Sequence, residues 1–497
     1  MPSNWGDAGV LRLVQDDRDG RGRIVRREVL RLGIHGLIGL GSLPAVAGLG
    51  DVLGLEAEAV RGRELVARSR GFGRARSVIV IYASGGQSQI DTWDPKPQAP
   101  LDIRGAFQPI QTSIPGVIFG EHMPRLAALA DRYAVIRSMS HQDTDHGSAT
   151  YLTLTGQYHR RLSSNPDPSP LDLPTLGSRL NRISPGGIFP YPALHINAPA
   201  LVPIRVAPGQ DAGLLGRDYD PLLVGDPTQG NLALPGLETV EELPVMRLDE
   251  RHGLKATLDA YVGRLATRQP AQDLSHLYQQ ALEMLSSPRC RHAFDLQREP
   301  ESLRDRYGRH RSGQSCLLAR RLVEAGARFV NVIWNHSNRG QDERPDDTDV
   351  YGWDTHNDIF TALADHLMPR FDASVSTLLE DLEQRGLLKE TLVVCLGEFG
   401  RAPRVAREPG FKGNAPGRKH WATVYSIMLA GAGVRPGKIV GASDRLGGEP
   451  VGERFGPWDV AATIFSALGM NPSGHYTDPL ERPFPLSVGQ PIEALYS

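Results

Sequence analysis

The chain has 497 residues, of which 40% are hydrophobic and 23% charged, enough to bury a large core. Its formal net charge is −2, and it has no basic stripe and no tail rich in Lys and Arg, which argues against nucleic acid as a partner. The three cysteines form no CxxC pair, so neither a zinc knuckle nor a disulfide framework is predicted.

The N-terminal region predicts an export signal. Arg26 and Arg27 precede an uncharged, moderately apolar run at residues 32–43, and small residues suited to cleavage follow at 45–47. This order is typical of a secretory signal, and the paired arginines resemble a twin-arginine signal. The alternative is a buried helix with basic flanks, but the apolar run is too short to span a bilayer.

We therefore predict a twin-arginine-type signal peptide at residues 1–47 and a linker at residues 48–76. The predicted partner in export is the twin-arginine machinery. The mature protein is expected to be periplasmic or secreted, with no stable membrane span.

The first core strand is predicted at residues 77–82, a short β-branched run that ends just before Gly85 and Gly86. A helix at 124–132 and a strand at 133–137 follow. The next segment, residues 140–148, places two histidines and two carboxylates at the start of a helix that runs to Leu154. Such a cluster suits an anion or a metal ion, and the alternative is a polar cap with a solvated loop. Asp145 or Ser148 is the expected cap.

The second half of the chain alternates helices and strands after a loop-rich insertion near residues 199–250. Strands alternating with helices predict one domain, residues 77–497, with a parallel or mixed sheet covered by helices on both faces. The predicted helices are 248–268, 273–286, 314–326, 359–385 with a kink at Pro369, and 460–468; the predicted strands are 328–334, 392–396 and 423–429.

Polar side chains follow the predicted strands where a ligand is expected. Glu398 and Arg401 come directly after the apolar run 392–396, and His420 follows a Pro- and Gly-rich stretch. Ligands of open α/β sheets lie beyond the carboxyl ends of the strands. Asp354 and His356 follow another predicted strand. Four groups are therefore expected to converge at this edge: residues 85–91, residues 141–148, Asp354 with His356, and Glu398 with His420. Carboxylates and imidazoles are ligands for zinc or manganese, and carboxylates alone suit calcium or magnesium.

Six motifs, taken together and in order, resemble the secreted bacterial family labelled domain of unknown function 1501. That family is similar to the alkaline phosphatase and sulfatase superfamily. The resemblance implies a three-layer α/β/α sandwich with a central, mostly parallel sheet, and a metal-dependent site that hydrolyses phosphate or sulfate esters. The motifs are SGGQSQIDTWDPKP at 84–97, RSMSHQDTDHGSATYLTLTG at 137–156, GQDAGLLGRDYDPLLV at 209–224, WDTH at 353–356, LGEFGR at 396–401 and GRKHW at 417–421.

The resemblance also implies metal ligands. Asp354 and His356 resemble the aspartate and histidine ligands of the superfamily. Glu398 stands where its Asp-His-Gly motif has the aspartate, and His420 where it has a late histidine. The superfamily's first strand usually ends in a metal-binding aspartate, whereas here Asp91 comes later, so it or Gln87 is expected to face the other ligands. Zinc or manganese is favoured over calcium.

The motifs also indicate catalytic candidates. The segment 153–156 resembles the end of the sulfatase helix whose start carries the nucleophile, which makes Ser148 the candidate nucleophile and His146 a base, a ligand or the attacking group. Arg401 or Arg137 could hold the anion. Because the sequence has no cysteine at residues 146–148, a formylglycine-type sulfatase is disfavoured.

Two functions remain open at this stage. The first is a hydrolase acting on a small-molecule or polysaccharide ester of sulfate or phosphate. The second is a secreted, non-catalytic binding protein that keeps the fold with a degenerate metal site, which Phe399 in place of the motif's histidine would favour.

Overall fold

The structure, a computed structural model, describes residues 70–185, 187–202, 204–229, 287–335 and 352–497. All of these belong to one compact unit, Val66–Ser497. The predicted signal peptide, most of the predicted linker, and the helices predicted at 248–268 and 273–286 lie outside the described residues. Within the described ranges, no helix has both the length and the apolar character needed to cross a membrane.

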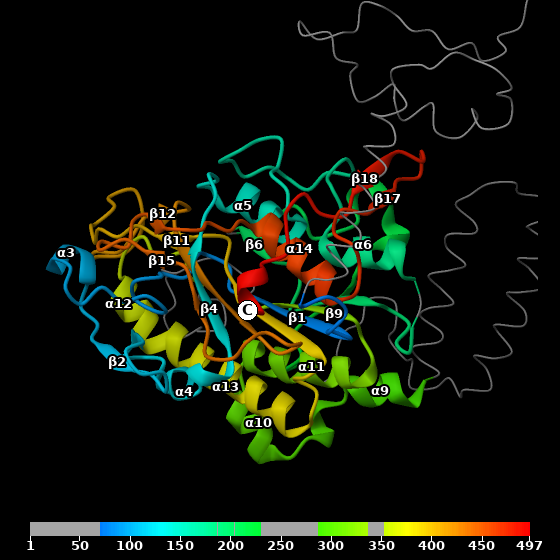
Figure 1. Ribbon diagram of the computed structural model, residues 1–497, viewed down its shortest axis with the longest axis horizontal. Helices are drawn as coiled ribbons and strands as arrows, with labels where there is room; N and C mark the ends of the chain where they lie inside the picture. The colour runs from blue at the N-terminus through cyan, green and yellow to red at the C-terminus, as the bar shows by residue number, and fades with distance from the viewer. Residues whose placement is uncertain (1–69, 186, 203, 230–286, 336–351) are drawn as a thin grey trace, which may run out of the picture. The chain divides into compact units, whose positions relative to one another are not determined.

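A central sheet organises the described unit (Figure 1). Only β13 runs antiparallel to its neighbours, β4 and β10, and every other neighbouring pair in this sheet is parallel. The predicted mostly parallel sheet is therefore confirmed. From one edge to the other the strands are β14 (Ile439–Val440), β4 (Ala134–Met139), β13 (Tyr425–Ala430), β10 (Thr391–Leu396), β1 (Ser77–Tyr82), β9 (Phe329–Ile333), β5 (Ala193–Ile196) and β8 (Leu222–Val224).

The two central strands, β1 and β10, are buried along their whole length. Their β-branched and apolar residues have no polar alternation because helices cover both faces, which is why the sequence shows continuous apolar runs. β1 lies at the predicted residues, and β10 begins one residue before the predicted run 392–396. The strands predicted at 133–137, 328–334 and 423–429 are also present, with ends shifted by one or two residues.

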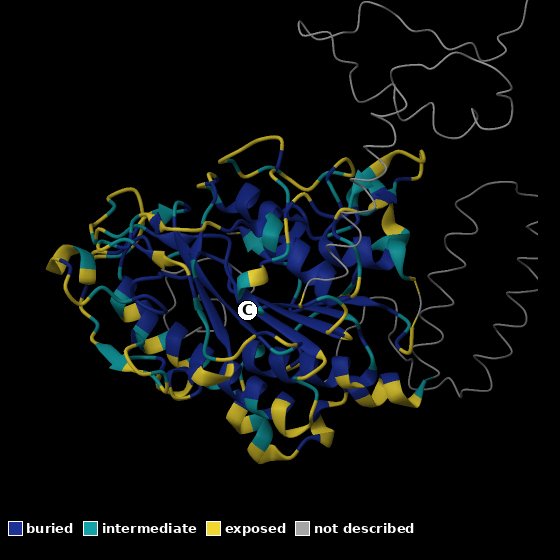
Figure 2. Cartoon of the chain, in the orientation of Figure 1, coloured by how far each residue is buried: buried dark blue, intermediate teal, exposed yellow. Residues whose placement is uncertain are grey.

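Alternate residues of β1 pack into two separate cores, one on each face of the sheet. Ile79 and Ile81 face one core, and Val78 and Val80 the other. Figure 2 shows the strands and the inner helix faces as buried. The predicted three-layer arrangement is therefore confirmed. The first core is covered by α4 (Pro124–Ala128), α9 (Pro288–Phe294), α10 (Glu301–Tyr307), α11 (Arg311–Ala325) and α13 (Met368–Gln384), and the second by α5 (His146–Thr155), α6 (Leu176–Ile183) and α14 (Pro457–Ala467).

The helix predicted at 359–385 is interrupted near Pro369. A short α12 (Ile359–Thr361) leads into a π-helical turn (Ala362–Leu367), and Pro369 lies in the first turn of α13. Proline removes a backbone donor and its ring clashes with the carbonyl four residues earlier. The wider π turn relieves that clash, so the predicted irregularity is real and has this form.

Short elements complete the described unit. The paired two-stranded ribbons are β2 (Pro109–Gln111) with β3 (Ile118–Gly120), β6 (Leu201–Val202) with β7 (Arg205–Val206), β11 (Gly400–Arg401) with β12 (His420–Trp421), β15 (Ala442–Ser443) with β16 (Pro450–Val451), and β17 (His475–Thr477) with β18 (Pro483–Pro485). The remaining single turns are α3 (Leu101–Arg104) and the 3-10 turns Ala130–Arg132, Gly213–Leu215, Arg217–Tyr219, Leu296–Arg298 and Glu493–Leu495.

The carboxyl ends of β4, β10, β1 and β9 point to the same edge of the sheet, since β4 and β10 both run antiparallel to β13. Gly85 and Gly86 follow β1, Glu398 follows β10, and α5 begins a few residues after β4. This edge is where the sequence placed the polar groups, and it is where ligands bind in open α/β sheets.

Candidate metal centre

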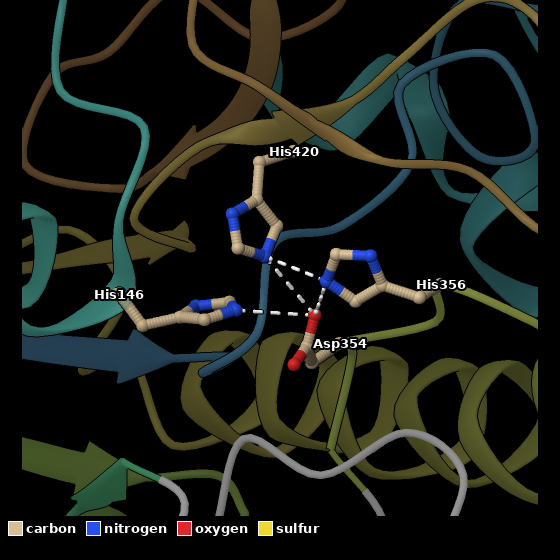
Figure 3. A group of neighbouring side chains, drawn as sticks. All are labelled: His146, Asp354, His356 and His420. Carbon is tan, nitrogen blue, oxygen red and sulfur yellow. Dashed lines mark hydrogen bonds and ion pairs between the residues drawn. The ribbon is translucent and has the colours of Figure 1, made fainter. Parts of the chain in front are cut away.

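Four side chains meet at this edge of the sheet: His146, Asp354, His356 and His420 (Figure 3). His146 is the first residue of α5, Asp354 and His356 lie in the segment before α12, and His420 is on β12. One potential ligand atom from each lies within 4.8 Å of all the others. Among the described residues, this is the one group of its kind.

The three imidazoles present the same nitrogen, Nε2, to one oxygen of Asp354. From Asp354 Oδ1, Nε2 is 3.1 Å away in His146, 2.9 Å in His356 and 3.3 Å in His420. The view in Figure 3 shows the three rings surrounding that oxygen from different directions. Three nitrogens and one carboxylate oxygen form a donor set that suits zinc and similar transition metals.

Each of these imidazoles is held from behind through its other nitrogen, Nδ1. An oxygen acceptor at Nδ1 places the proton there and leaves the Nε2 lone pair facing the cluster. The three contacts are His146 Nδ1 to Glu398 Oε1 at 2.6 Å, His356 Nδ1 to Glu408 Oε2 at 2.5 Å, and His420 Nδ1 to the Thr144 carbonyl at 2.7 Å.

His356 and His420 approach each other closely. Their Nε2 atoms are 2.9 Å apart, and each imidazole already has an acceptor at Nδ1. Two facing lone pairs repel unless a proton or a cation lies between them. The arrangement therefore fits a divalent cation held by the three Nε2 atoms and the Asp354 carboxylate.

Asp354 is held in place by Arg401 and by the backbone around Gly85. Arg401 is fully buried and donates from one terminal nitrogen to Asp354 Oδ1 at 2.6 Å and to the Gly85 carbonyl. Gly85 has φ of +112°, and a Cβ there would lie 2.3 Å from the Asp354 nitrogen. Glycine is therefore required for β1 to approach this segment so closely.

The charges of the cluster shift the pKa values of its members. Burial acts to lower the pKa of His146, but Asp354 and Glu398 outweigh it and raise that pKa to about 9. Burial acts to raise the pKa of Asp354, but His146 and Arg401 hold it well below its usual range. Burial and the charge of His146 lower the pKa of His420 to about 4. In the metal-free cluster His146 is therefore the protonated, positively charged imidazole, and His420 is neutral.

The predicted ligands Glu398 and Asp91 lie outside this group of four. Glu398 is fully buried behind His146, where it also accepts from the Gly85 nitrogen at 2.8 Å and from the Tyr82 hydroxyl at 3.1 Å. Asp91 forms a two-point ion pair with the buried Arg418, at 2.7 and 3.1 Å. Because their oxygens have these strong partners, Glu398 acts on the cluster through His146, and Asp91 is part of a separate ion pair. Gln87, the alternative to Asp91, accepts a long hydrogen bond from Trp93 Nε1 at 3.4 Å.

Ser148, the predicted nucleophile, is enclosed by the segments before and after α5. Its hydroxyl donates to Asp143 Oδ1 at 2.7 Å and accepts from the Ser164 nitrogen at 3.1 Å. The backbone N–H groups expected to bind an anion are occupied as well: that of Gly147 donates to Asn165 Oδ1, and that of Ser148 to the Ser164 carbonyl. Neither Ser148 nor the N-cap residue Asp145 caps α5 through its side chain, because residues 164–165 fulfil that role.

The predicted anion-binding arginines are both engaged. All three guanidinium nitrogens of Arg401 donate, to the carbonyls of Gly85, Gly86 and Arg418 and to Asp354. Arg137 lies 3.2 Å from Asp94. Arg401 therefore serves as a fixed positive charge beside the cluster, and its guanidinium is already occupied by these protein acceptors.

Sequence reasoning missed Glu408 and the Thr144 carbonyl, the partners of His356 and His420. Glu408 lies in a Pro- and Gly-rich stretch with no motif, 52 residues after His356. A backbone carbonyl leaves no sequence signal at all. Only the folded loops place these acceptors behind the imidazoles.

Comparison with curated proteins gives no match. Similar solved structures include the crystal structure of Ps i-CgsB, with 11% identity, a TM-score of 0.40 and coverage of 84% of this chain and 76% of that one. The PsFucS1 sulfatase from Pseudoalteromonas sp. has 13% identity, a TM-score of 0.35 and coverage of 84% and 71%. The phosphonate monoester hydrolase SpPMH from Silicibacter pomeroyi has 13% identity, a TM-score of 0.37 and coverage of 84% and 76%.

A family model described as "Protein of unknown function (DUF1501)" matches residues 75–496. The match spans every motif quoted above and includes all four residues of the cluster. The resemblance inferred from the motifs is therefore confirmed, and this chain belongs to the family described as Protein of unknown function (DUF1501).

Proposed function

We propose that this protein is an exported, metal-dependent hydrolase of sulfate or phosphate esters that holds one divalent cation through His146, Asp354, His356 and His420. The observation that carries the proposal is the common orientation of the three imidazoles. Each is anchored at Nδ1 by an oxygen and presents Nε2 to the same point. Mixed nitrogen and oxygen donors favour zinc or manganese over calcium, which prefers oxygen alone.

One cation per chain is expected, because the two other predicted carboxylate ligands already have protein partners. Glu398 is bound by His146, Gly85 and Tyr82, and Asp91 by Arg418. The guanidinium of Arg401 adds a permanent positive charge at Asp354. This buried charge favours an anionic group nearby.

A divalent cation in this centre would supply Lewis acidity toward an ester oxygen and lower the pKa of a bound water. The chain's own contribution is orientation and charge. Glu398, Glu408 and Thr144 fix the imidazole tautomers, and Arg401 keeps Asp354 ionised. The nucleophile and base named from the sequence, Ser148 and His146, are both engaged: the Ser148 hydroxyl is bound between Asp143 and Ser164, and His146 is one of the four proposed ligands.

Metal analysis of purified protein tests the proposal. Zinc or manganese is expected near one per chain, and activity toward 4-nitrophenyl sulfate or phosphate should disappear with a chelator and return with metal. His356→Ala and His420→Ala should each lose the metal, since each removes one of four ligands. His475→Ala, an exposed histidine on β17, is the matched control and should retain it.

Two results would contradict the proposal in different ways. Protein that binds no divalent cation under any tested condition would remove the metal centre. Protein that binds one cation and hydrolyses neither ester would favour the second candidate, a secreted binding protein with this fold. The buried partners of Glu398 and Asp91, and Phe399 beside His146, are the observations that keep this candidate open.

Export is part of the proposal and rests on Arg26, Arg27 and the small residues at 45–47. Passage through the twin-arginine machinery would place the mature protein in the periplasm or outside the cell. Mass analysis of protein recovered from the native host should show a start soon after Ala47. An intact Met1 on exported protein would contradict the predicted cleavage.

A further inference from the structure

The loop between β11 and β12, residues 402–419, is fixed directly against the metal centre. Asn357, next to His356, is fully buried and donates to three carbonyls of this loop, those of Glu408, Phe411 and Lys412. It also accepts from the Glu408 nitrogen at 2.9 Å. We call residues 402–419 the outer loop. Its conformation is set by the same segment that carries two of the cluster residues.

Phe411 of the outer loop stacks on the imidazole of His356, with ring centroids 3.7 Å apart and planes inclined by 7°. The residue nevertheless remains 42% exposed. A large aromatic ring held rigidly and left open beside a candidate ligand is a surface for another flat apolar group. The apolar face of a sugar ring has that character.

The outer loop is strongly basic on its surface. It carries four exposed basic residues, and its one acidic residue, Glu408, is turned to His356 and Lys419. Arg404 has a partner in Asp102 at 3.4 Å, where both side chains are largely exposed. This contrasts with a net charge of −2 for the whole chain. The four exposed basic residues are Arg404, Arg407, Lys412 and Lys419.

A second basic loop adjoins the cluster through Thr144. Residues 157–165, which we call the α5 loop, carry the exposed Arg160 and Arg161 and no acidic residue. Ser163 of this loop lies 3.1 Å from the Thr144 hydroxyl, and the Thr144 carbonyl holds His420. Basic residues therefore stand on loops that reach the cluster through His356 and through His420.

We propose that the outer loop and the α5 loop bind the non-reacting part of an anionic polysaccharide, one that carries sulfate or phosphate groups on several sugars. This inference rests on the proposed function, because it names the substrate class of that site. Arg and Lys would pair with flanking anionic groups, and Phe411 would pack on a sugar face. A spread of charge over two loops fits a ligand of several sugars better than a small ester with one charge.

The test measures binding of a fluorescently labelled, sulfated oligosaccharide by anisotropy, with the metal content of each preparation determined in parallel. The double variant Arg407→Ala/Lys412→Ala should bind at least roughly tenfold more weakly at low salt, and this difference should shrink at about 0.5 M salt because exposed charges are screened. Phe411→Ala should weaken binding by roughly threefold or more, and this loss should persist in salt because apolar contacts are not screened.

The matched control is Arg291→Ala/Arg298→Ala, which removes the same charge from exposed positions in the α9 region and should bind as the wild type does. Equal weakening by this control would show that only net charge matters and would overturn the inference. So would a single-stranded DNA of similar charge that binds as tightly and loses affinity in the same variants. Retained metal in the outer-loop variants would show that the centre is intact.

The same measurements separate this inference from the proposed function. If wild-type protein holds its metal and hydrolyses 4-nitrophenyl esters but does not bind the oligosaccharide, the inference fails and the proposed function stands. If it binds the oligosaccharide but neither holds metal nor hydrolyses an ester, the proposed function fails, and so does the assignment of the polysaccharide as a substrate.

Discussion

Two regions of the molecule bury several charged side chains, and they treat that charge differently. One is the metal centre at the edge of the sheet. The other, which we call the arginine network, joins α11, the C-terminal end of α13 and Glu299, which follows the 3-10 turn Leu296–Arg298, on the opposite side of the fold (Figure 1). It contains three arginines and three carboxylates: Arg320, Arg321, Arg385, Glu299, Glu324 and Asp381.

The arginine network is balanced within itself. Arg320, fully buried, places its three nitrogens 2.8 Å from Glu299, 2.7 Å from Glu324 and 2.8 Å from Asp381. Arg385 pairs with the same three carboxylates at 2.7 to 3.3 Å. Each positive group meets negative groups at hydrogen-bonding distance, so the network needs nothing from outside.

The metal centre is not balanced in that way. Three imidazoles converge on one oxygen of Asp354, and two of their nitrogens face each other at 2.9 Å. Buried ion pairs of the balanced kind support structure, whereas imidazole lone pairs that converge on one point indicate a cation site. The comparison predicts that changes in the network reduce stability, and that changes in the centre reduce metal binding.

The largest expected effect comes from breaking the network. Arg320→Met leaves the carboxylates of Glu299 and Asp381 buried without their central partner and should cost about 3–5 kcal/mol of unfolding free energy. Denaturant unfolding measures the loss, with metal content of the folded fraction unchanged. Arg309→Ala, which removes an exposed pair with Asp305, is the control and should cost less than about 1 kcal/mol. A similar cost for both would show that the network is not a structural unit.

The next effect should appear in metal affinity. Glu408→Gln replaces the carboxylate behind His356 by a neutral amide, which holds the ring tautomer less firmly. Metal affinity should fall by about 10- to 100-fold with little change in the stability of the metal-free protein. Competition with a chelator measures the affinity, and the exposed Glu453→Gln is the control. Unchanged metal affinity in Glu408→Gln would show that Glu408 does not support the metal centre.

A smaller effect concerns His195, a buried imidazole on β5 for which no hydrogen-bond partner is found at either nitrogen. Burial lowers the pKa of His195 to about 3. Because the folded pKa lies below the unfolded value near 6.5, the stabilising contribution is present above that value and is lost as the pH falls toward 3. The wild type should lose about 2 kcal/mol more than His195→Asn between pH 7 and pH 5. Urea unfolding at both pH values measures this, and parallel losses would contradict it.

The smallest effect is expected at Ser148. Its hydroxyl is bound between Asp143 and Ser164, so Ser148→Ala should cost about 1 kcal/mol and leave turnover near that of the wild type. A kinetic assay with 4-nitrophenyl esters and a thermal unfolding curve measure both quantities. A fall in turnover of roughly a hundredfold with the fold intact would restore Ser148 as the nucleophile.

Much of the fold could be predicted from the sequence, because the patterns that indicate strands and helix breaks are local. The runs at 77–82 and 392–396 are short, rich in β-branched residues and uninterrupted, and both form central strands. Pro369 predicted the irregularity in the helix at 359–385. The short strands β5, β8 and β14 were not predicted, since two to four residues give too little periodicity and their pairing depends on neighbours distant in sequence.

His146, Asp354, His356 and His420 could be named from the sequence, because strand ends and motifs point to one edge of the sheet and imidazoles and carboxylates have few uses there. Which of the named carboxylates would face the imidazoles could not be predicted. Asp91 meets Arg418 across 327 positions and Glu398 lies behind His146 across 252, while Glu408, with no motif, lies behind His356. Residue type and local pattern determine which groups can bind a metal. The direction of each side chain, and the partner behind it, depend on packing between segments far apart in the chain, and only the tertiary structure decides them.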